Sequence, residues 1–152
     1  EVATKLVGQG VVPGEIYNRI YENRLPEQAK LLGLVLQDIN YELDGKIAWF
    51  KITQDMLRKA GAKSDEIEGF TDFVRGIRGV EVAVKFLQSS NSHTRINFRS
   101  KGSIVINKLA KKFNGGGHPY AAGAEIFKSL DESIADLLPE LKKCIQEQTA
   151  KD

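Results

Sequence analysis

The 152-residue chain has little cysteine and little histidine, and these shortages exclude several kinds of site. A single cysteine, Cys144, cannot form a disulfide within the chain, and its isolation is typical of a reducing compartment. Only two histidines, His93 and His118, are present, so with the single cysteine the chain has too few nitrogen and sulfur ligands for a typical zinc site. The acid nearest to His118 in sequence, Glu125, has no recognised spacing for Ser/His/Asp chemistry. The residues therefore do not predict hydrolytic catalysis by this chain alone.

Long apolar runs are also missing from the sequence. No run approaches the roughly 20 residues that span a bilayer, and no signal peptide is visible. Hydrophobic residues make up 41% of the chain, which is enough to form the core of a compact domain. We therefore expect no membrane association and a cytoplasmic location.

Acidic residues are absent from the whole interval between Glu81 and Glu125. The basic residues of this interval are Lys85, Arg95, Arg99, Lys101, Lys108, Lys111 and Lys112. They give it a charge of +7, and because the whole chain carries +2, the remainder carries −5. Such a segment favours a polyanionic ligand. The alternative is that these residues only form a solvated strand and helix surface. For Lys108, Lys111 and Lys112 taken one at a time, the two interpretations are equally good.

Three consecutive glycines, Gly115, Gly116 and Gly117, precede His118. Each glycine costs about 0.5–1 kcal/mol relative to alanine when it is ordered. The run therefore predicts a loop whose backbone passes close to another group and exposes its N–H groups. Backbone donors beside a titratable imidazole indicate a phosphate or nucleotide site. A turn histidine bonded to a neighbouring carbonyl is the alternative for His118.

The residues before the glycines predict a strand followed by a helix. In the strand 94–100, Arg95, Asn97 and Arg99 alternate with apolar or small residues and share one face. A helix over 104–113 follows, with Ser103 as its cap, and Asn114 is expected to end it in a left-handed conformation.

Arg99 thus falls at the end of a strand, where a planar guanidinium suits bidentate phosphate binding. The lack of acids nearby in sequence favours ligand contact over an ordinary surface ion pair. Ser100 is a weaker candidate, since its hydroxyl could reach a phosphate or only face solvent.

The remaining pattern predicts an α+β fold in which a mixed sheet is flanked by helices and preceded by an N-terminal helical leader. We assign residues 1–39 to the leader and 40–152 to the main domain. The expected elements are helices opened by Pro13 and Pro26, a hairpin over 41–50 with an Asp44-Gly45 turn, a helix from Thr53 to Gly61, a helix from Ser64, strands 80–87 and 124–127, and a final helix from Asp131 that Pro139 bends.

Several of these motifs resemble the DHH-associated domain of the DHH phosphoesterases. The resemblance rests on Phe98-Arg99-Ser100, on Ala110-Lys111-Lys112-Phe113, on Gly-Gly-Gly-His, and on Ala121-Ala122-Gly123. It extends backward through 79–84 and 65–70 and covers roughly residues 40–130. The most similar subgroup hydrolyses short RNA and removes a phosphate from 3′-phosphoadenosine 5′-phosphate.

The resemblance implies a second, N-terminal catalytic domain that holds two divalent metals, usually manganese, with an Asp-His-His motif. That motif is absent here, and the chain begins at Glu1 within helical sequence. We therefore expect a C-terminal piece of a larger enzyme that binds no cofactor itself, its leader running from the catalytic domain. By the same resemblance, Arg99, Ser100, Gly115–Gly117 and His118 would bind a short RNA, DNA or nucleotide substrate. The sequence does not decide whether the chain forms a homodimer through the exposed leader.

Two other functions remain open from the sequence. A related domain ends alanyl-tRNA synthetases, where it contacts tRNA and pairs subunits, but those versions usually replace the loop histidine with a basic residue. His118 and Ala121-Ala122-Gly123 favour the phosphoesterase branch. A cyclic-dinucleotide phosphodiesterase shares the same glycine motif.

Overall fold

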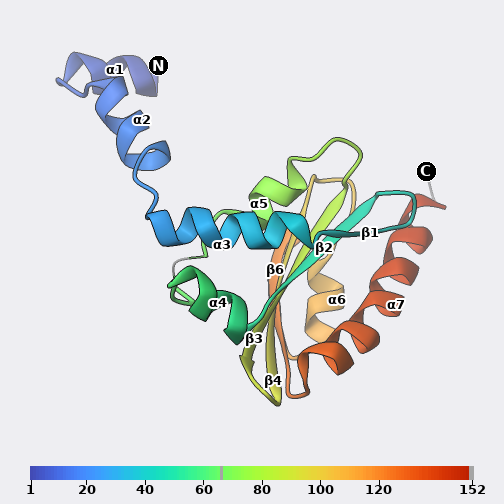
Figure 1. The fold of residues 1–152 in the computed structure, drawn as a ribbon. Coiled ribbons are helices and arrows are strands. Elements are labelled where there is room, and N and C mark those ends of the chain that lie inside the picture. Colours follow the sequence, from blue (N-terminus) through green and yellow to red (C-terminus); the bar gives the residue numbers. More distant parts are fainter. Residues whose placement is uncertain (66, 151–152) are drawn as a thin grey trace.

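A six-stranded mixed sheet forms the centre of the protein, in a computed structural model that describes residues 1–65 and 67–150 (Figure 1). The strand order is β1-β2-β3-β4-β6-β5. The strands are β1 (Asn40–Glu42), β2 (Ile47–Ile52), β3 (Val82–Ser90), β4 (His93–Ser100), β5 (Gly116–His118) and β6 (Ala121–Ile126). The helices are α1 (Val2–Gly8), α2 (Pro13–Tyr21), α3 (Pro26–Gln37), α4 (Gln54–Ala60), α5 (Phe70–Arg75), α6 (Asn107–Lys112) and α7 (Leu130–Thr149). The predicted α+β class is confirmed.

The pair β2–β3 is parallel, and the other neighbouring strands are antiparallel. A parallel pair needs a crossover connection, and here the crossover contains α4 and α5. The predicted hairpin joins β1 to β2, and Gly45 at its turn has a φ of 85°. Thr53 caps α4 by accepting a hydrogen bond from Met56 N, and Gly61 ends that helix in the left-handed conformation. These local predictions are confirmed.

One face of the sheet is covered by α6 and α7. Side chains alternate along a strand, so Val84 and Phe86 of β3 and Ile96 and Phe98 of β4 enter this layer together. They pack with apolar residues of the two helices: Leu109, Ala110, Leu137, Leu141 and Ile145.

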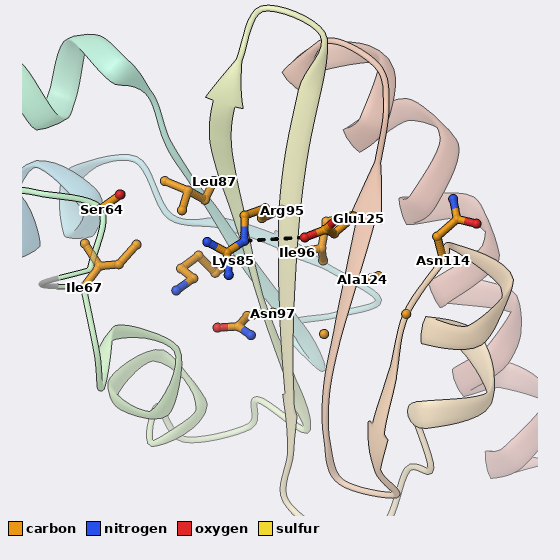
Figure 2. Close-up of a pocket in the computed structure, with 12 residues that line it drawn as sticks. Ser64, Ile67, Lys85, Leu87, Arg95, Ile96, Asn97, Asn114, Ala124 and Glu125 are labelled. Carbon is orange, nitrogen blue, oxygen red and sulfur yellow. Dashed lines mark ion pairs between the residues drawn. The ribbon is translucent and has the colours of Figure 1, made fainter.

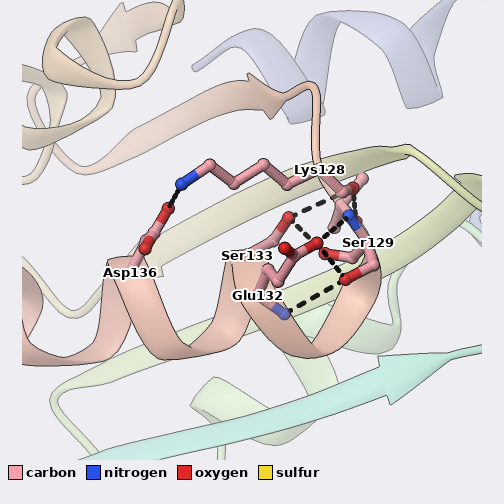
Figure 3. A network of polar contacts seen from close by, with 6 residues as sticks. Lys128, Ser129, Glu132, Ser133 and Asp136 are labelled. Carbon is pink, nitrogen blue, oxygen red and sulfur yellow. Dashed lines mark hydrogen bonds and ion pairs between the residues drawn. The ribbon is translucent and has the colours of Figure 1, made fainter.

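The α7 helix begins with a hydrogen-bonded cap (Figure 3). Glu132 N donates to Ser129 Oγ at 3.4 Å, and Ser129 N donates to Glu132 Oε2 at 3.1 Å, which satisfies donors that a helix start leaves free. The Ser129 hydroxyl also lowers the pKa of Glu132 by hydrogen bonding. Lys128 and Asp136 form an ion pair of 2.7 Å across the first turns. The cap fixes where α7 starts its path across the sheet.

The opposite face is covered only over part of its width. Helices α3, α4 and α5 pack over β2 and β3, around a second core that includes Phe50, Ile52 and Leu87, and α5 also contacts β4. Leu31 and Val35 of α3 are fully buried there, so α3 packs into the domain, whereas α1 and α2 bury no residue and extend away from the sheet (Figure 1). The boundary between residues 39 and 40 stays a prediction.

Two predicted helix starts are wrong. The segment after Ser64 is a loop, and α5 begins only at Phe70, because Gly69 before it has a φ of 82° that no helix accommodates. Part of that prediction, Glu66, lies outside the described residues. Ser103 does not cap α6, which starts at Asn107; its hydroxyl donates instead to Glu81 Oε2 at 2.8 Å.

The glycine run is also not a loop, because Gly116–His118 forms the edge strand β5 against β6. A Cβ at Gly115 would lie 2.0 Å from Gly123 O, and a Cβ at Gly117 would lie 2.6 Å from Ala121 O. Gly117 also has a φ of 135°. The group that this backbone approaches closely is therefore the neighbouring strand. Asn114 has a φ of 52°, as predicted.

We predict that Gly115→Ala lowers the free energy of unfolding by roughly 2 kcal/mol or more, because its methyl group collides with β6 backbone. Gly116→Ala is the matched control, since a Cβ there meets nothing within 4 Å. The control should change stability by less than about 1 kcal/mol. Urea unfolding of both variants measures the difference, and equal stabilities would contradict the close packing of β5 on β6.

Candidate functional site

The uncovered part of the second face lies over β6, β5 and the part of β4 that α5 does not contact. Among the described residues, the helices that contact β5 and β6 pack from the other face, through the core formed with α6 and α7. Strand pairing places Arg99 of β4 opposite Ala121 of β6, and Ala121 opposite His118 of β5. Directly paired residues point to the same face, so Arg99 and His118 share this face. Their backbones are two strand spacings apart, which is about 10 Å.

The next two rows along the strands differ sharply in bulk. Asn97 is paired with Gly123, and Gly123 with Gly116, so two of three positions have no side chain. One step further, Arg95 is paired with Glu125. The row of Asn97 is therefore a depression in the surface at Gly123 and Gly116. It lies between the row of Arg99 and the row of Arg95.

Two adjoining hollows of about 330 and about 560 Å³ lie over this part of the sheet. Both are lined by Ser64, Ile67, Lys85, Arg95 and Asn97, so together they form one groove. Figure 2 shows Lys85, Arg95 and Asn97 gathered over the strands, between the loop that carries Ser64 and Ile67 and strand β6. The floor of the groove is thus sheet, and one wall is the loop before α5.

Arg99 lines the larger hollow and is held at its side by Asp72. Its Nε lies 3.5 Å from Asp72 Oδ2, and its Nη1 donates to Phe98 O at 3.1 Å. Asp72 also pairs with Arg75 at 3.1 Å. A guanidinium has five donors, so these two contacts leave several N–H groups of Arg99 for a ligand.

The expectation that Arg99 has few carboxylates around it is wrong. The interval without acids is acid-free only along the chain, because folding brings Asp72 of α5 beside Arg99 and pairs Glu125 with Arg95 at 3.8 Å. Both pairs are partly exposed, and such pairs contribute about 0–1 kcal/mol. They orient the arginines and leave room for competition by a phosphate.

The other predicted residues lie at different distances from the groove. His118 is exposed, and its imidazole has no polar partner among residues 1–65 and 67–150. Gly115 lines the smaller hollow. Ser100 is 1% exposed on the opposite face, where its Oγ accepts a hydrogen bond from Gly102 N at 3.3 Å.

Lys85 is the most unusual residue of the groove, although along the sequence it is only one of seven cations in the interval without acids. Burial is the largest cause that lowers its pKa to about 8, the charges of Arg95 and Arg99 act in the same direction, and Glu68 has a weaker opposite effect. A signal was available in the sequence, because Lys85 is a charged residue inside the apolar run of β3. Asn97 was placed on the correct face but given no role.

A metal ion has no evident place in this part of the molecule. No group of three or more His, Cys, Asp or Glu side chains that could hold one occurs among the described residues. The two metals implied by the sequence resemblance therefore find no set of ligands among residues 1–65 and 67–150. No helix in the described ranges is long and apolar enough to cross a membrane.

The fold and groove define an α+β domain with a cationic, half-open sheet face. A model of the DHHA1 domain family matches residues 44–147 of this domain. The chain belongs to the DHHA1 domain family, so the resemblance to the DHH-associated domain is confirmed.

Two curated relatives carry the name bifunctional oligoribonuclease and PAP phosphatase NrnA. The protein from Bacillus subtilis is 36% identical over 137 residues, which are 89% of this chain and 42% of the relative. The protein from Thermus thermophilus is 33% identical over 130 residues, 86% of this chain and 38% of the relative. The chain thus spans about two-fifths of the length of the relatives that it matches.

Solved structures show the same fold. An exopolyphosphatase-related protein from Bacteroides fragilis superimposes with a TM-score of 0.81 and 24% identity, over 99% of this chain and 42% of that one. The pGpG-specific phosphodiesterase PggH from Vibrio cholerae gives a TM-score of 0.54 and 12% identity, over 83% of this chain and 40% of that one. At these identities the likeness concerns the fold alone.

We predict that Lys85→Met raises the free energy of unfolding at pH 7 by on the order of 1 to 3 kcal/mol. The ordinary pKa of 10.5 falls to about 8 in the folded protein, so the unfolded chain binds more protons between these values. The contribution of Lys85 to the free energy of unfolding therefore rises as the pH increases from 8 to 10.5. The Lys85→Met variant should show no such rise.

Urea unfolding at several pH values measures both effects, with Lys111→Met on the exposed surface of α6 as the control of equal charge. A Lys85 variant with the stability and pH slope of the control would contradict the strained burial of this cation.

Proposed function

We propose that the chain is the substrate-binding domain of a metal-dependent phosphoesterase that hydrolyses short oligonucleotides or nucleoside bisphosphates. Membership of the DHHA1 family supports this, as do relatives named for oligoribonuclease and PAP phosphatase activity. The observation that carries the proposal is the placement of Arg99 and His118 in one row of an uncovered sheet face, beside a cationic groove. Both side chains can donate hydrogen bonds to a phosphate.

Within the proposed site, Arg99 binds a substrate phosphate through the N–H groups that Asp72 and Phe98 leave free. His118 binds the same nucleotide from the far side of Ala121, whose small side chain leaves the space between them open. Strand β5 is the edge of the sheet, so amides of Gly115–Gly117 that face outward have no further strand to bond and are assigned to the ligand. The Ser100 hydroxyl acts indirectly, by ordering the turn at Gly102.

The hydrolytic step is assigned to a separate catalytic domain that holds the metals, for which manganese is proposed, because the described residues form no metal site. This chain would supply position and charge, which lower the barrier by holding the substrate in a reactive orientation. Helices α1 and α2, which bury no residue, would lead to that catalytic domain. The proposal places the whole enzyme in the cytoplasm.

We predict that Arg99→Ala and His118→Ala each weaken binding of a 5′-phosphorylated adenosine dinucleotide by roughly 10-fold or more. The reason is that a hydrogen bond to a charged group contributes about 1.5–3 kcal/mol. Isothermal titration calorimetry on the 152-residue chain measures the affinities.

Arg78→Ala is the matched control, since Arg78 is exposed in the connection between α5 and β3 and lines neither hollow. It removes the same charge and should leave the affinity within about twofold of wild type. A nucleic-acid-binding or oligomerisation module without this clamp would give equal affinities for all three variants, and that result would refute the proposal.

A further inference from the structure

Lys85 lies between the two arginines of the groove. It is paired directly with Asn97 across the β3–β4 ladder, and Arg95 and Arg99 stand two residues to either side of Asn97. Diagonal neighbours of this kind lie about 7–8 Å apart in an antiparallel pair. Three cations are therefore grouped on one face of two adjacent strands.

The Lys85 ammonium has no hydrogen-bond or ion-pair partner among the described residues. Its stem lies in the hollow that Ile67 and Leu87 also line, so water covers it only in part. A cation that is partly desolvated and makes no direct ion pair with a described residue is unfavourable in a folded protein. An anion bound in the groove would remove this penalty.

Arg95 completes the cluster from the other side. Its side chain is 61% exposed, and its contact with Glu125, at 3.8 Å, is shared with His93, which lies 3.6 Å from the other carboxylate oxygen. An exposed contact of this length contributes about 0–1 kcal/mol, so the guanidinium can turn toward the groove at little cost. Asn97, between the arginines, adds amide donors at the floor.

The wall facing these cations carries carboxylates rather than more bases: Asp65, Glu68 and Asp72. Asp72 is already engaged by Arg75 and Arg99. Carboxylates accept hydrogen bonds from hydroxyl groups. A groove with cations on its floor and carboxylates on its wall matches a nucleotide, which carries phosphates and ribose hydroxyls together, better than it matches inorganic phosphate.

We propose that Lys85, Arg95 and Asn97 form a second phosphate subsite, which binds the phosphate adjacent to the one held by Arg99 and His118. This inference rests on the proposed function and adds a preference for substrates with two linked nucleotides over a single nucleotide. Successive phosphorus atoms of an oligonucleotide are separated by one ribose and its ester oxygens. That linker can cover roughly the distance from Arg99 to Lys85.

The test compares a 5′-phosphorylated adenosine dinucleotide with adenosine 5′-monophosphate, which lacks the second phosphate. Calorimetry on the 152-residue chain should show that Lys85→Met lowers the affinity for the dinucleotide by about 10-fold and the affinity for the monophosphate by less than about twofold. Arg99→Ala should weaken both ligands. Lys111→Met, which removes a lysine of the same basic interval on α6, should change neither.

The pH dependence gives a second readout. Since the pKa of Lys85 is about 8, the preference of wild type for the dinucleotide should fall between pH 7.5 and 9, and Lys85→Met should show no such fall. Among the described residues, the charged groups that line the groove with Lys85 are Arg95, Arg99, Asp65, Glu68, Asp72 and Glu125. Arginine and carboxylate side chains keep their charge in this range, and so does a phosphate monoester.

The possible outcomes separate the two proposals. If Lys85→Met binds the dinucleotide with wild-type affinity while Arg99→Ala binds it more weakly, only the second subsite is overturned. Equal weakening of both ligands by Lys85→Met would also overturn it, because Lys85 would then serve the first phosphate. Wild-type affinities in both variants, or no binding of either ligand by wild type, would overturn the subsite and the proposed function together.

Discussion

Strand β4 lies inside the sheet between β3 and β6, and the alternation of its side chains is the constraint on which the rest of the structure depends. Thr94, Ile96 and Phe98 are buried on one face, where α7 covers the strand. The intervening Arg95, Asn97 and Arg99 must then lie on the other face. A register shift of one residue would bury two arginines and expose the core. Burial of the apolar set therefore fixes the position of the polar set, and β3 adds Lys85 to the same face through its pairing with Asn97.

The glycine run has a structural role that precedes any role in binding. Gly115 and Gly117 let β5 lie against β6 where a Cβ would collide with the backbone, while Gly116 and Gly123 leave the surface next to Asn97 without side chains. His118 reaches the row of Arg99 only because β5 pairs in this register. Packing and ligand access thus depend on the same residues, so a substitution at Gly116 separates the two roles better than one at Gly115 or Gly117.

Local signals predicted much of the fold, because they depend on residues close in sequence. The caps at Thr53 and Gly61, the Asp44-Gly45 hairpin and the two faces of β4 are examples. The helix expected from Ser64 failed because the left-handed Gly69 and the burial of Ile67 fix that segment as a loop. The helix start at Ser103 failed because Ile106 N bonds to Pro119 O, a partner distant in sequence. The groove was missed for the same reason, since Asp72, Glu68 and Lys85 meet Arg99 only after folding.

We propose that the uncovered half of the sheet binds the phosphates of a nucleotide. The most direct test is a titration of the chain with a 5′-phosphorylated dinucleotide, followed by NMR of the backbone amides and of the imidazole groups. We expect saturable shifts along β4, β5 and β6, including Arg99, Gly115–Gly117 and His118, with little change on α6 and α7. Shifts confined to the exposed lysines of α6, or no shifts at millimolar ligand, would contradict phosphate binding on this face.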